Sequence, residues 1–399
     1  MNPHDDHVVA LLAAVALLAL LPTNPLGAQE PLDWEAIADR LVAQIDPHPG
    51  ERVLLVALPG RFDALVPILR RKLGATGAVD LGAIATRSPQ PASWKTEFTS
   101  SLRGRGQQEL VAALADVDVA VMMPGATPAD PVYAAMQQVL WSGTGRTVHF
   151  HWSGTYWPSM ETRPEDDASD ALLQRALLET DYAALAAIQQ QFAAAMRRAP
   201  VHVTTPAGTD LRFEVRDRPV TRQDGDASAA RAATARNLID REIELPAGAI
   251  RVAPIEATVN GTIVFPPSLW NRTIVEDLRL VFENGKVVSM DATSGLELAE
   301  DVMRRAGDSA RAFREFVLGF NPLLPVAGGA DPWIPYYGYG AGIVRLSLGD
   351  NRELGGAVTG GFVRWNLFLD ATVQVGDETW VTAGQLTPPP MPRGRPGAG

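Results

Sequence analysis

The sequence predicts an α/β protein in which an N-terminal domain around a parallel sheet precedes a C-terminal domain rich in antiparallel strands. In the first half, short continuous apolar runs alternate with segments that carry apolar residues at helical spacing, which is the order of a βαβ repeat. Beyond about residue 200, apolar and polar residues alternate, and Gly, Asn or Pro separates the runs, as in antiparallel sheets. The 399 residues are enough for two hydrophobic cores.

The elements of the first half follow this order from its beginning. Residues 33–45 have apolar positions three or four apart and predict a helix. A continuous apolar run at 52–58 predicts a buried strand, and a Pro-Gly turn separates it from a helical pattern over 62–73. The same order continues as helix 110–114, strand 117–123, helix 131–140, strand 147–151 and a long helix over 180–198.

In the second half, alternating runs predict strands at 201–204, 210–215 and 278–288. We therefore place a domain boundary near residue 200, with an N-terminal domain over 29–200 and a C-terminal domain over 201–386. The Pro- and Gly-rich tail over 387–399 is predicted to be disordered.

The N-terminus carries an uninterrupted apolar run of 14 residues, Val8 to Leu21, followed by Pro22 and the small residues Gly27 and Ala28. The run is too short to span ~30 Å of hydrocarbon as a helix. It predicts a secretory signal over 1–28 and export to the periplasm or the extracellular space, with no stable membrane span after cleavage. The first seven residues hold no Lys or Arg, so an uncleaved anchor or a misassigned start is the alternative.

Composition excludes several classes of protein. The net charge of −11 argues against a general nucleic-acid binder, because phosphate attraction requires a basic surface. The absence of cysteine rules out disulfides and thiolate metal sites. The strand at 52–58 is followed by a single glycine, whereas a dinucleotide-binding loop needs several, so a Rossmann-type dinucleotide cofactor is not expected.

Several separated segments of the second half carry a more specific signal. In order, they are Leu245-Pro-Ala-Gly-Ala-Ile-Arg-Val-Ala-Pro254, Val259-Asn-Gly-Thr-Ile-Val-Phe-Pro-Pro-Ser268, Leu278-Arg-Leu-Val-Phe-Glu-Asn-Gly-Lys-Val287, Phe316-Val-Leu-Gly-Phe-Asn-Pro322 and Leu346-Ser-Leu-Gly-Asp-Asn-Arg-Glu-Leu-Gly-Gly356. In this order and spacing they resemble the aminopeptidase T type of leucyl aminopeptidase, over roughly residues 201–384. The resemblance implies a Rossmann-like α/β domain followed by a mixed, β-rich aminopeptidase T-like domain, a homodimer, and two divalent ions such as zinc or cobalt.

The resemblance also maps the metal ligands of the family onto this chain. The glutamate that follows the Leu-Pro-Ala-Gly segment is replaced by Ala249, whereas the glutamate that precedes the Gly-x-Asn-Pro segment is retained as Glu315. The family's histidine before the Leu-Gly segment is Arg345 here. Its His-x-Asp pair corresponds to Arg364 and Asn366, so one ligand of five is retained.

The family's catalytic tyrosine corresponds to Arg352, so no catalytic residue is assigned. A guanidinium group is always protonated and has no lone pair to offer, so it cannot bind a metal ion. We therefore expect no metal cofactor and a protein that is non-catalytic or binds a ligand. The alternative is a leucyl aminopeptidase-like metallopeptidase that uses Glu315 with an altered set of ligands.

The substitutions suggest what has replaced the metals. Arg345, Arg352 and Arg364 are expected to project into the former metal cavity, with Asn366 beside them and Tyr337 as an aromatic wall. Such a pocket would attract a small anionic or peptide ligand. The alternative is that Arg345 only pairs with Glu315 and binds nothing.

Two histidines stand apart from this set. His149 and His151 are two residues apart on a predicted strand and are therefore expected to face the same side of the sheet. This spacing permits joint metal binding, but a role in hydrogen bonding to neighbouring loops is the more common outcome.

Overall fold

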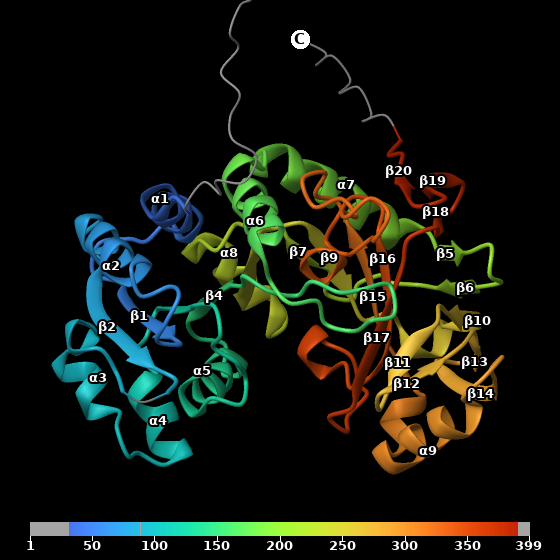
Figure 1. Ribbon diagram of the computed structural model, residues 1–399, viewed down its shortest axis with the longest axis horizontal. Helices are drawn as coiled ribbons and strands as arrows, with labels where there is room; N and C mark the ends of the chain where they lie inside the picture. The colour runs from blue at the N-terminus through green and yellow to red at the C-terminus, as the bar shows by residue number, and fades with distance from the viewer. Residues whose placement is uncertain (1–31, 88, 390–399) are drawn as a thin grey trace, which may run out of the picture. The chain divides into compact units, whose positions relative to one another are not determined.

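A five-stranded parallel sheet organises the first half of the chain in the computed structural model, which describes residues 32–87 and 89–389 (Figure 1). Its strand order is β2-β1-β3-β4-β8, and every neighbouring pair is parallel. The strands are β1 (Arg52–Ala57), β2 (Val79–Ala85), β3 (Val119–Met122), β4 (Arg146–Phe150) and β8 (Glu242–Leu245).

Helices cover both faces of this sheet. Val53 and Leu55 of β1 belong to the same buried cluster as α1 and α2, whereas Leu54 and Val56 pack with α4 and α5. A strand buried on both faces reads as a continuous apolar run, which is why β1 was predictable. The helices of this half are α1 (Trp34–Ile45), α2 (Leu65–Ala75), α3 (Glu97–Ser101), α4 (Gln107–Leu114), α5 (Pro131–Trp141), α6 (Asp167–Glu179) and α7 (Tyr182–Arg198).

The second half is built mainly from antiparallel strands. An eight-stranded sheet has the order β14-β13-β10-β6-β5-β18-β19-β20, and a five-stranded sheet has the order β17-β16-β15-β9-β7. The strands of the larger sheet are β5 (Val201–Thr204), β6 (Asp210–Phe213), β10 (Asn260–Phe265), β13 (Leu278–Glu283), β14 (Lys286–Asp291), β18 (Thr372–Val375), β19 (Glu378–Thr382) and β20 (Gln385–Leu386). Those of the smaller sheet are β7 (Thr221–Gln223), β9 (Ala249–Val252), β15 (Phe313–Gly319), β16 (Val344–Gly349) and β17 (Val363–Phe368).

Shorter elements connect these sheets. Strands β11 (Ser268–Trp270) and β12 (Thr273–Val275) form a hairpin of their own. The helices α8 (Ala229–Ala233) and α9 (Leu296–Ala306) lie between strands of the second half. Single helical turns are η1 (Ala92–Trp94), η2 (Ile239–Arg241), η3 (Glu256–Thr258), η4 (Asp308–Arg311), η5 (Tyr336–Gly338) and η6 (Arg352–Leu354).

The predicted fold class is confirmed, and the strands expected at 52–58, 117–123, 147–151 and 201–204 are present within a residue or two. Sequence reasoning missed β2 and did not place β8 in the parallel sheet. β8 pairs in parallel with β4 although it lies beyond residue 200. Residues from Leu32 onward form one compact unit, and the division near residue 200 stays a prediction.

The connection from β8 to β9 determines where the functional site lies. Residues 246–248 lead directly from the edge of the parallel sheet into the five-stranded antiparallel sheet. A Cβ atom on Gly248 would lie 2.9 Å from the carbonyl oxygen of Tyr339, so the loop after η5 packs against the bare glycine backbone. Side chains of β4, β8, β9 and residues 336–339 are thereby brought together.

No helix of the described part of the chain is long and apolar enough to cross a membrane. The predicted leader over 1–28 lies outside the described residues, as does the predicted tail beyond residue 389.

Candidate functional site

A cavity of about 370 Å³, which we call the central pocket, lies between strands β4 and β8 and the five-stranded antiparallel sheet. Its lining is unusually rich in ionisable groups. Three arginines, four glutamates, two histidines and four large aromatic residues contribute to it: Arg251, Arg314, Arg345, Glu242, Glu244, Glu315, Glu353, His149, His151, Tyr133, Tyr337, Tyr339 and Trp365.

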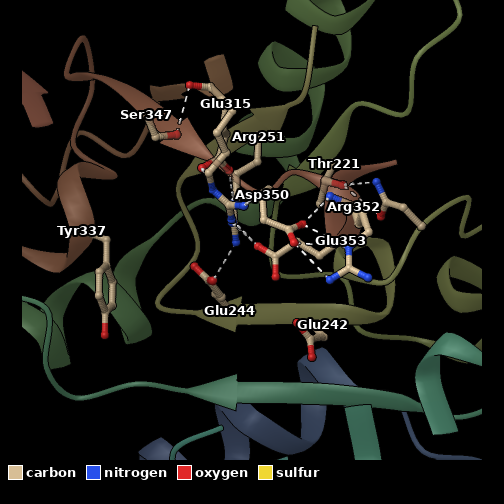
Figure 2. A network of polar contacts seen from close by, with 12 residues as sticks. Thr221, Glu242, Glu244, Arg251, Glu315, Tyr337, Ser347, Asp350, Arg352 and Glu353 are labelled. Carbon is tan, nitrogen blue, oxygen red and sulfur yellow. Dashed lines mark hydrogen bonds and ion pairs between the residues drawn. The ribbon is translucent and has the colours of Figure 1, made fainter. Parts of the chain in front are cut away.

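Arg251 of β9 is the centre of the polar network in this pocket (Figure 2). Its Nε donates to Glu315 Oε1 at 2.6 Å, and its Nη1 donates to Glu244 Oε1 at 3.2 Å. Its Nη2 lies 3.5 Å from Glu353 Oε1, a carboxylate that Arg314 also contacts. One guanidinium group therefore links three carboxylates from three different elements.

Glu315 of β15 remains ionised despite being almost completely buried. Burial opposes ionisation, but the positive charges of Arg251, Arg345 and Arg314 hold its pKa at about 2. The same pairing acts on Arg251: burial favours the neutral form, yet Glu315 and the other acidic groups raise its pKa well above the ordinary value. The pair therefore stays charged across the physiological pH range.

Arg345 of β16 is held more loosely. It is 5% exposed, yet its Nη2 lies 3.5 Å from Glu315 Oε2 and its Nη1 lies 3.4 Å from the carbonyl oxygen of Tyr337. Its Nε has no hydrogen-bond partner among the described residues. The guanidinium carbon lies 5.1 Å from the ring centre of Trp365. Aromatic rings and long contacts thus position this group and leave hydrogen-bonding capacity unused.

The opposite wall of the pocket carries groups that are neutral at pH 7. Burial lowers the pKa of both His149 and His151, whose rings are in edge contact with centres 5.5 Å apart. The hydroxyl of Tyr133 lies 3.1 Å from His149 Nδ1. Burial, followed by the charge of Glu353, raises the pKa of Glu242 to about 8, so this carboxyl is protonated at neutral pH. The expectation that the two histidines share one face is confirmed.

The structure brings some of the predicted residues into the central pocket. Glu315, Arg345 and Tyr337 line it. Ala249 is fully buried at the start of β9, opposite Gly319 of β15. Arg251 lies two residues farther along, on the same face of the strand as Ala249. Tyr337 is in edge contact with His151, with ring centres 5.7 Å apart.

Arg352 does not line the central pocket. It lines an adjoining hollow of about 250 Å³, which shares Arg314 and Glu353 with the central pocket, and pairs with Asp350 through an Nη2–Oδ2 contact of 3.0 Å, with a side chain that is 57% exposed. Burial opposes ionisation of Asp350, but hydrogen bonds from Arg352 and from the backbone of Gly361 and Gly360 lower its pKa to about 2. Figure 2 shows Arg352 engaged with Asp350 rather than with Glu315.

Arg364 and Asn366 point to the other face of the antiparallel sheet. Ser347 of β16 pairs with Glu315 of β15 on one side and with Trp365 of β17 on the other, so these three side chains share a face. Arg364 and Asn366 are the neighbours of Trp365 along β17 and therefore face the opposite side. Arg364 stacks on Trp270 at 3.5 Å and donates to the carbonyl of Leu269 at 3.0 Å. Because successive strand residues face opposite sides, the expected convergence of these two residues with Glu315 is not observed. Whether any of the predicted residues binds a ligand stays a prediction.

Sequence reasoning missed Arg251, which forms ion pairs with three carboxylates of the pocket. A signal was present, because Arg251 follows Ala249, which the resemblance aligns with a metal ligand, by two residues on a strand and must share its face. It missed Glu244 and Glu353 as well. These residues come from segments far apart in the sequence, so no local pattern marks them as neighbours of Glu315.

Comparisons with known proteins bear on both the fold and the family. Residues 180–323 match the family model described as thermophilic metalloprotease (M29). Wild-type AmpT from Thermus thermophilus aligns with a TM-score of 0.58 and 15% identity, over 89% of this chain and 98% of that one. The 2,5-dihydroxypyridine dioxygenase from Pseudomonas putida KT2440 aligns with a TM-score of 0.57 and 16% identity, over 90% and 97% of the two chains. The search of curated proteins gives no match.

Proposed function

We propose, from the match of residues 180–323 to the thermophilic metalloprotease (M29) model and the structural likeness to AmpT, that this chain is a relative of the aminopeptidase T type whose metal centre has been replaced by ion pairs and that binds a peptide-like ligand. The observation that carries the proposal is the pairing of Glu315, the one retained ligand position, with Arg251 at 2.6 Å. A cation now occupies the place beside this carboxylate where the family would hold a divalent ion.

The donor set of the central pocket argues against a two-metal centre. Two divalent ions need several carboxylates and imidazoles, both as ligands and to balance their charge. Within residues 32–87 and 89–389, no group of three or more His, Cys, Asp or Glu side chains is placed to hold a metal ion. The side chains of β17 that do line the pocket are Val363 and Trp365, which offer no ligand atom.

The charge balance of the pocket favours a ligand that carries both signs of charge. Three arginines face four glutamates, and Glu242 is protonated at neutral pH because its pKa is about 8. The pocket is therefore close to neutral, unlike the anion-attracting pocket expected from the sequence. Arg345, whose Nη contacts to Tyr337 and Glu315 are 3.4 and 3.5 Å long, can donate to a carboxylate, and Glu353, whose side chain is 32% exposed, can accept from an ammonium group. A small peptide or a free amino acid satisfies both.

A pair of matched variants tests this proposal. Arg345→Lys keeps the charge but removes the planar fork, whereas Arg364→Lys makes the same change on the opposite face of the sheet. We expect leucine or a leucine dipeptide to bind to the wild type in calorimetric titration, with affinity at least about tenfold weaker in Arg345→Lys. Arg364→Lys should bind as the wild type does. Equal affinities in the two variants, or no heat with any probe, would refute the proposal.

A leucyl aminopeptidase-like hydrolase with an altered metal site is the second candidate. The family match supports it, as does the placement of two neutral imidazoles, His149 and His151, on the same pocket as Glu244. The fold alone does not decide, because AmpT and a dioxygenase are both among the structures that this chain resembles. Near-stoichiometric zinc, cobalt or manganese in purified protein, with chelator-sensitive cleavage of a leucine anilide, would favour this candidate.

Export and dimer formation belong to the proposal as well. The apolar run over 8–21 supports a leader that is cleaved after Ala28, and the family resemblance supports a homodimer. Mass spectrometry of protein recovered from the periplasm or the medium should identify Gln29 as the first residue. Retention of residues 1–28 in a membrane fraction would instead indicate an uncleaved anchor. Light scattering of the purified protein measures the oligomeric state.

A further inference from the structure

A second cavity of about 340 Å³ lies between helix α7 and the segment from β7 through α8 to η2. We call it the basic pocket. Its lining contains four arginines, Arg197, Arg222, Arg231 and Arg236, and a single acidic residue, Asp240. Alanine side chains of α7 provide part of the remaining wall. None of these residues belongs to the central pocket.

Backbone carbonyl groups, rather than carboxylates, hold three of these arginines. Arg197 donates to the carbonyl oxygens of Arg216 and Arg218 at 3.0 and 3.3 Å. Arg236 donates to the carbonyl oxygen of Asp217 at 2.6 Å, and Arg231 donates to that of Arg222 at 3.1 Å. In the described part of the chain, none of these three arginines forms an ion pair with a carboxylate. A guanidinium has five N–H donors, so each keeps several for a ligand.

The acidic groups nearby offset only part of the positive charge of the pocket. Asp240 is 8% exposed, and its two oxygens accept from the Thr221 hydroxyl at 2.7 Å and from the Arg236 backbone N–H at 3.0 Å. Asp224 pairs with Arg222 at 3.2 Å and is itself buried. Four arginines against these two aspartates leave the pocket net positive in a chain whose net charge is −11. A local field of this sign attracts anions that the rest of the surface repels.

We propose that the basic pocket binds the phosphate group of a small phosphorylated compound. A monovalent carboxylate would leave most of these positive charges unbalanced, whereas a phosphate ester carries about two negative charges and three acceptor oxygens. The planar forks of arginine match phosphate oxygens in pairs. The carbonyl contacts already fix the orientation of the arginines, so less side-chain freedom is lost when the anion binds.

The basic pocket differs from the central pocket in the elements that supply its arginines and in its ligand. Its arginines come from α7, β7, α8 and the loop before η2, whereas the arginines of the central pocket come from β9, β15 and β16. The inference therefore does not rest on the proposed function, and either can fail without the other.

A charge-matched pair of double variants tests the inference. Arg231→Gln with Arg236→Gln removes two positive charges from the basic pocket. Arg304→Gln with Arg305→Gln removes two from the exposed face of α9, where the side chains are 71% and 75% exposed. Pyrophosphate, inorganic phosphate and glycerol 3-phosphate are titrated calorimetrically into each protein at low salt, with leucine as a separate probe of the central pocket.

We expect at least one phosphate compound to bind the wild type, with affinity at least about tenfold weaker in the pocket variant and within about twofold in the α9 variant. Weakening of equal size in both variants would mean non-specific attraction and would overturn the inference, as would no binding by any phosphate compound. If the pocket double variant does not fold, Arg197→Gln, at an exposed position in the last turn of α7, takes its place with Arg305→Gln as its control.

Discussion

The central pocket and the basic pocket use the same residue type in opposite ways. In the central pocket, Arg251 and Arg314 are buried and lie within ion-pair distance of glutamates. In the basic pocket, Arg231 and Arg236 are at least partly exposed and donate to backbone carbonyls. A buried arginine needs a carboxylate to offset its desolvation, whereas an exposed one can keep its charge available for a ligand. Arg345 lies between the two cases, since it is buried but only loosely paired.

The largest expected effect comes from removing the carboxylate that compensates the buried arginines. Glu315→Gln leaves Arg251 and Arg345 with much less negative charge beside them and should lower the free energy of unfolding by about 3–5 kcal/mol. Urea denaturation measures the loss. Glu353→Gln is the control. The side chain of Glu353 is 32% exposed, so water can replace part of the stabilisation that its carboxylate gives to the arginines. Similar losses in both variants would remove the contrast between buried and exposed pairs.

The pH dependence of stability should distinguish Glu242 from Glu315. The folded-state pKa of Glu242 is about 8, above the ordinary value of 4.5, so the unfolded chain binds fewer protons between these values. Stability should therefore fall as pH rises from 4.5 to 8, by an amount on the order of a few kcal/mol. Glu242→Gln should flatten this slope in denaturation measured at a series of pH values. An unchanged slope would show that Glu242 does not titrate in this range.

Glu315 should act in the opposite direction. Its folded-state pKa of about 2 lies below 4.5, so its contribution is complete above pH 4.5 and is lost as pH falls toward 2. Glu315→Gln should therefore weaken the acid sensitivity of the protein while leaving the slope near pH 7 unaltered.

A smaller effect is expected on the opposite face of the antiparallel sheet. Arg364→Met removes the stacking on Trp270 and the hydrogen bond to Leu269, which should cost about 1–3 kcal/mol. Burial lowers the pKa of Arg364 to about 10, so an apolar replacement also relieves a desolvation cost and keeps the net loss modest. Ligand binding in the central pocket should not change. A binding defect in this variant would mean that the two faces of the sheet are coupled.

The smallest effect on stability should come from the basic pocket. Arg231→Gln together with Arg236→Gln removes partly exposed hydrogen bonds to carbonyl groups, so the free energy of unfolding should change by about 1 kcal/mol or less. Thermal unfolding without ligand measures this change. A loss as large as that of Glu315→Gln would indicate that these arginines serve the fold rather than a ligand.

The parts of the fold that could be predicted are those whose signal is local. The continuous apolar run of β1 and the helical spacing of α1 reflect burial of a single element, and both were placed within a residue or two. β8 was not assigned to the parallel sheet, because its alternating acidic and apolar residues also fit an antiparallel strand. In the candidate site, the sequence predicted that Glu315, Arg345, Arg364 and Asn366 converge on one pocket. The structure places Glu315 and Arg345 there, and it places Arg364 and Asn366 on the other face of the sheet.

The sequence by itself predicted the fold class, most strands and helices of the first half, and the resemblance to the thermophilic metalloprotease family that residues 180–323 match. Only the tertiary structure decided which side chains meet. The register between β16 and β17 places Trp365, and not Arg364, on the face of the sheet that carries Glu315. This register depends on backbone pairing between segments that are distant in the sequence. The partners of Arg251 likewise come from β8, β15 and η6, which are neighbours only after the sheets have packed.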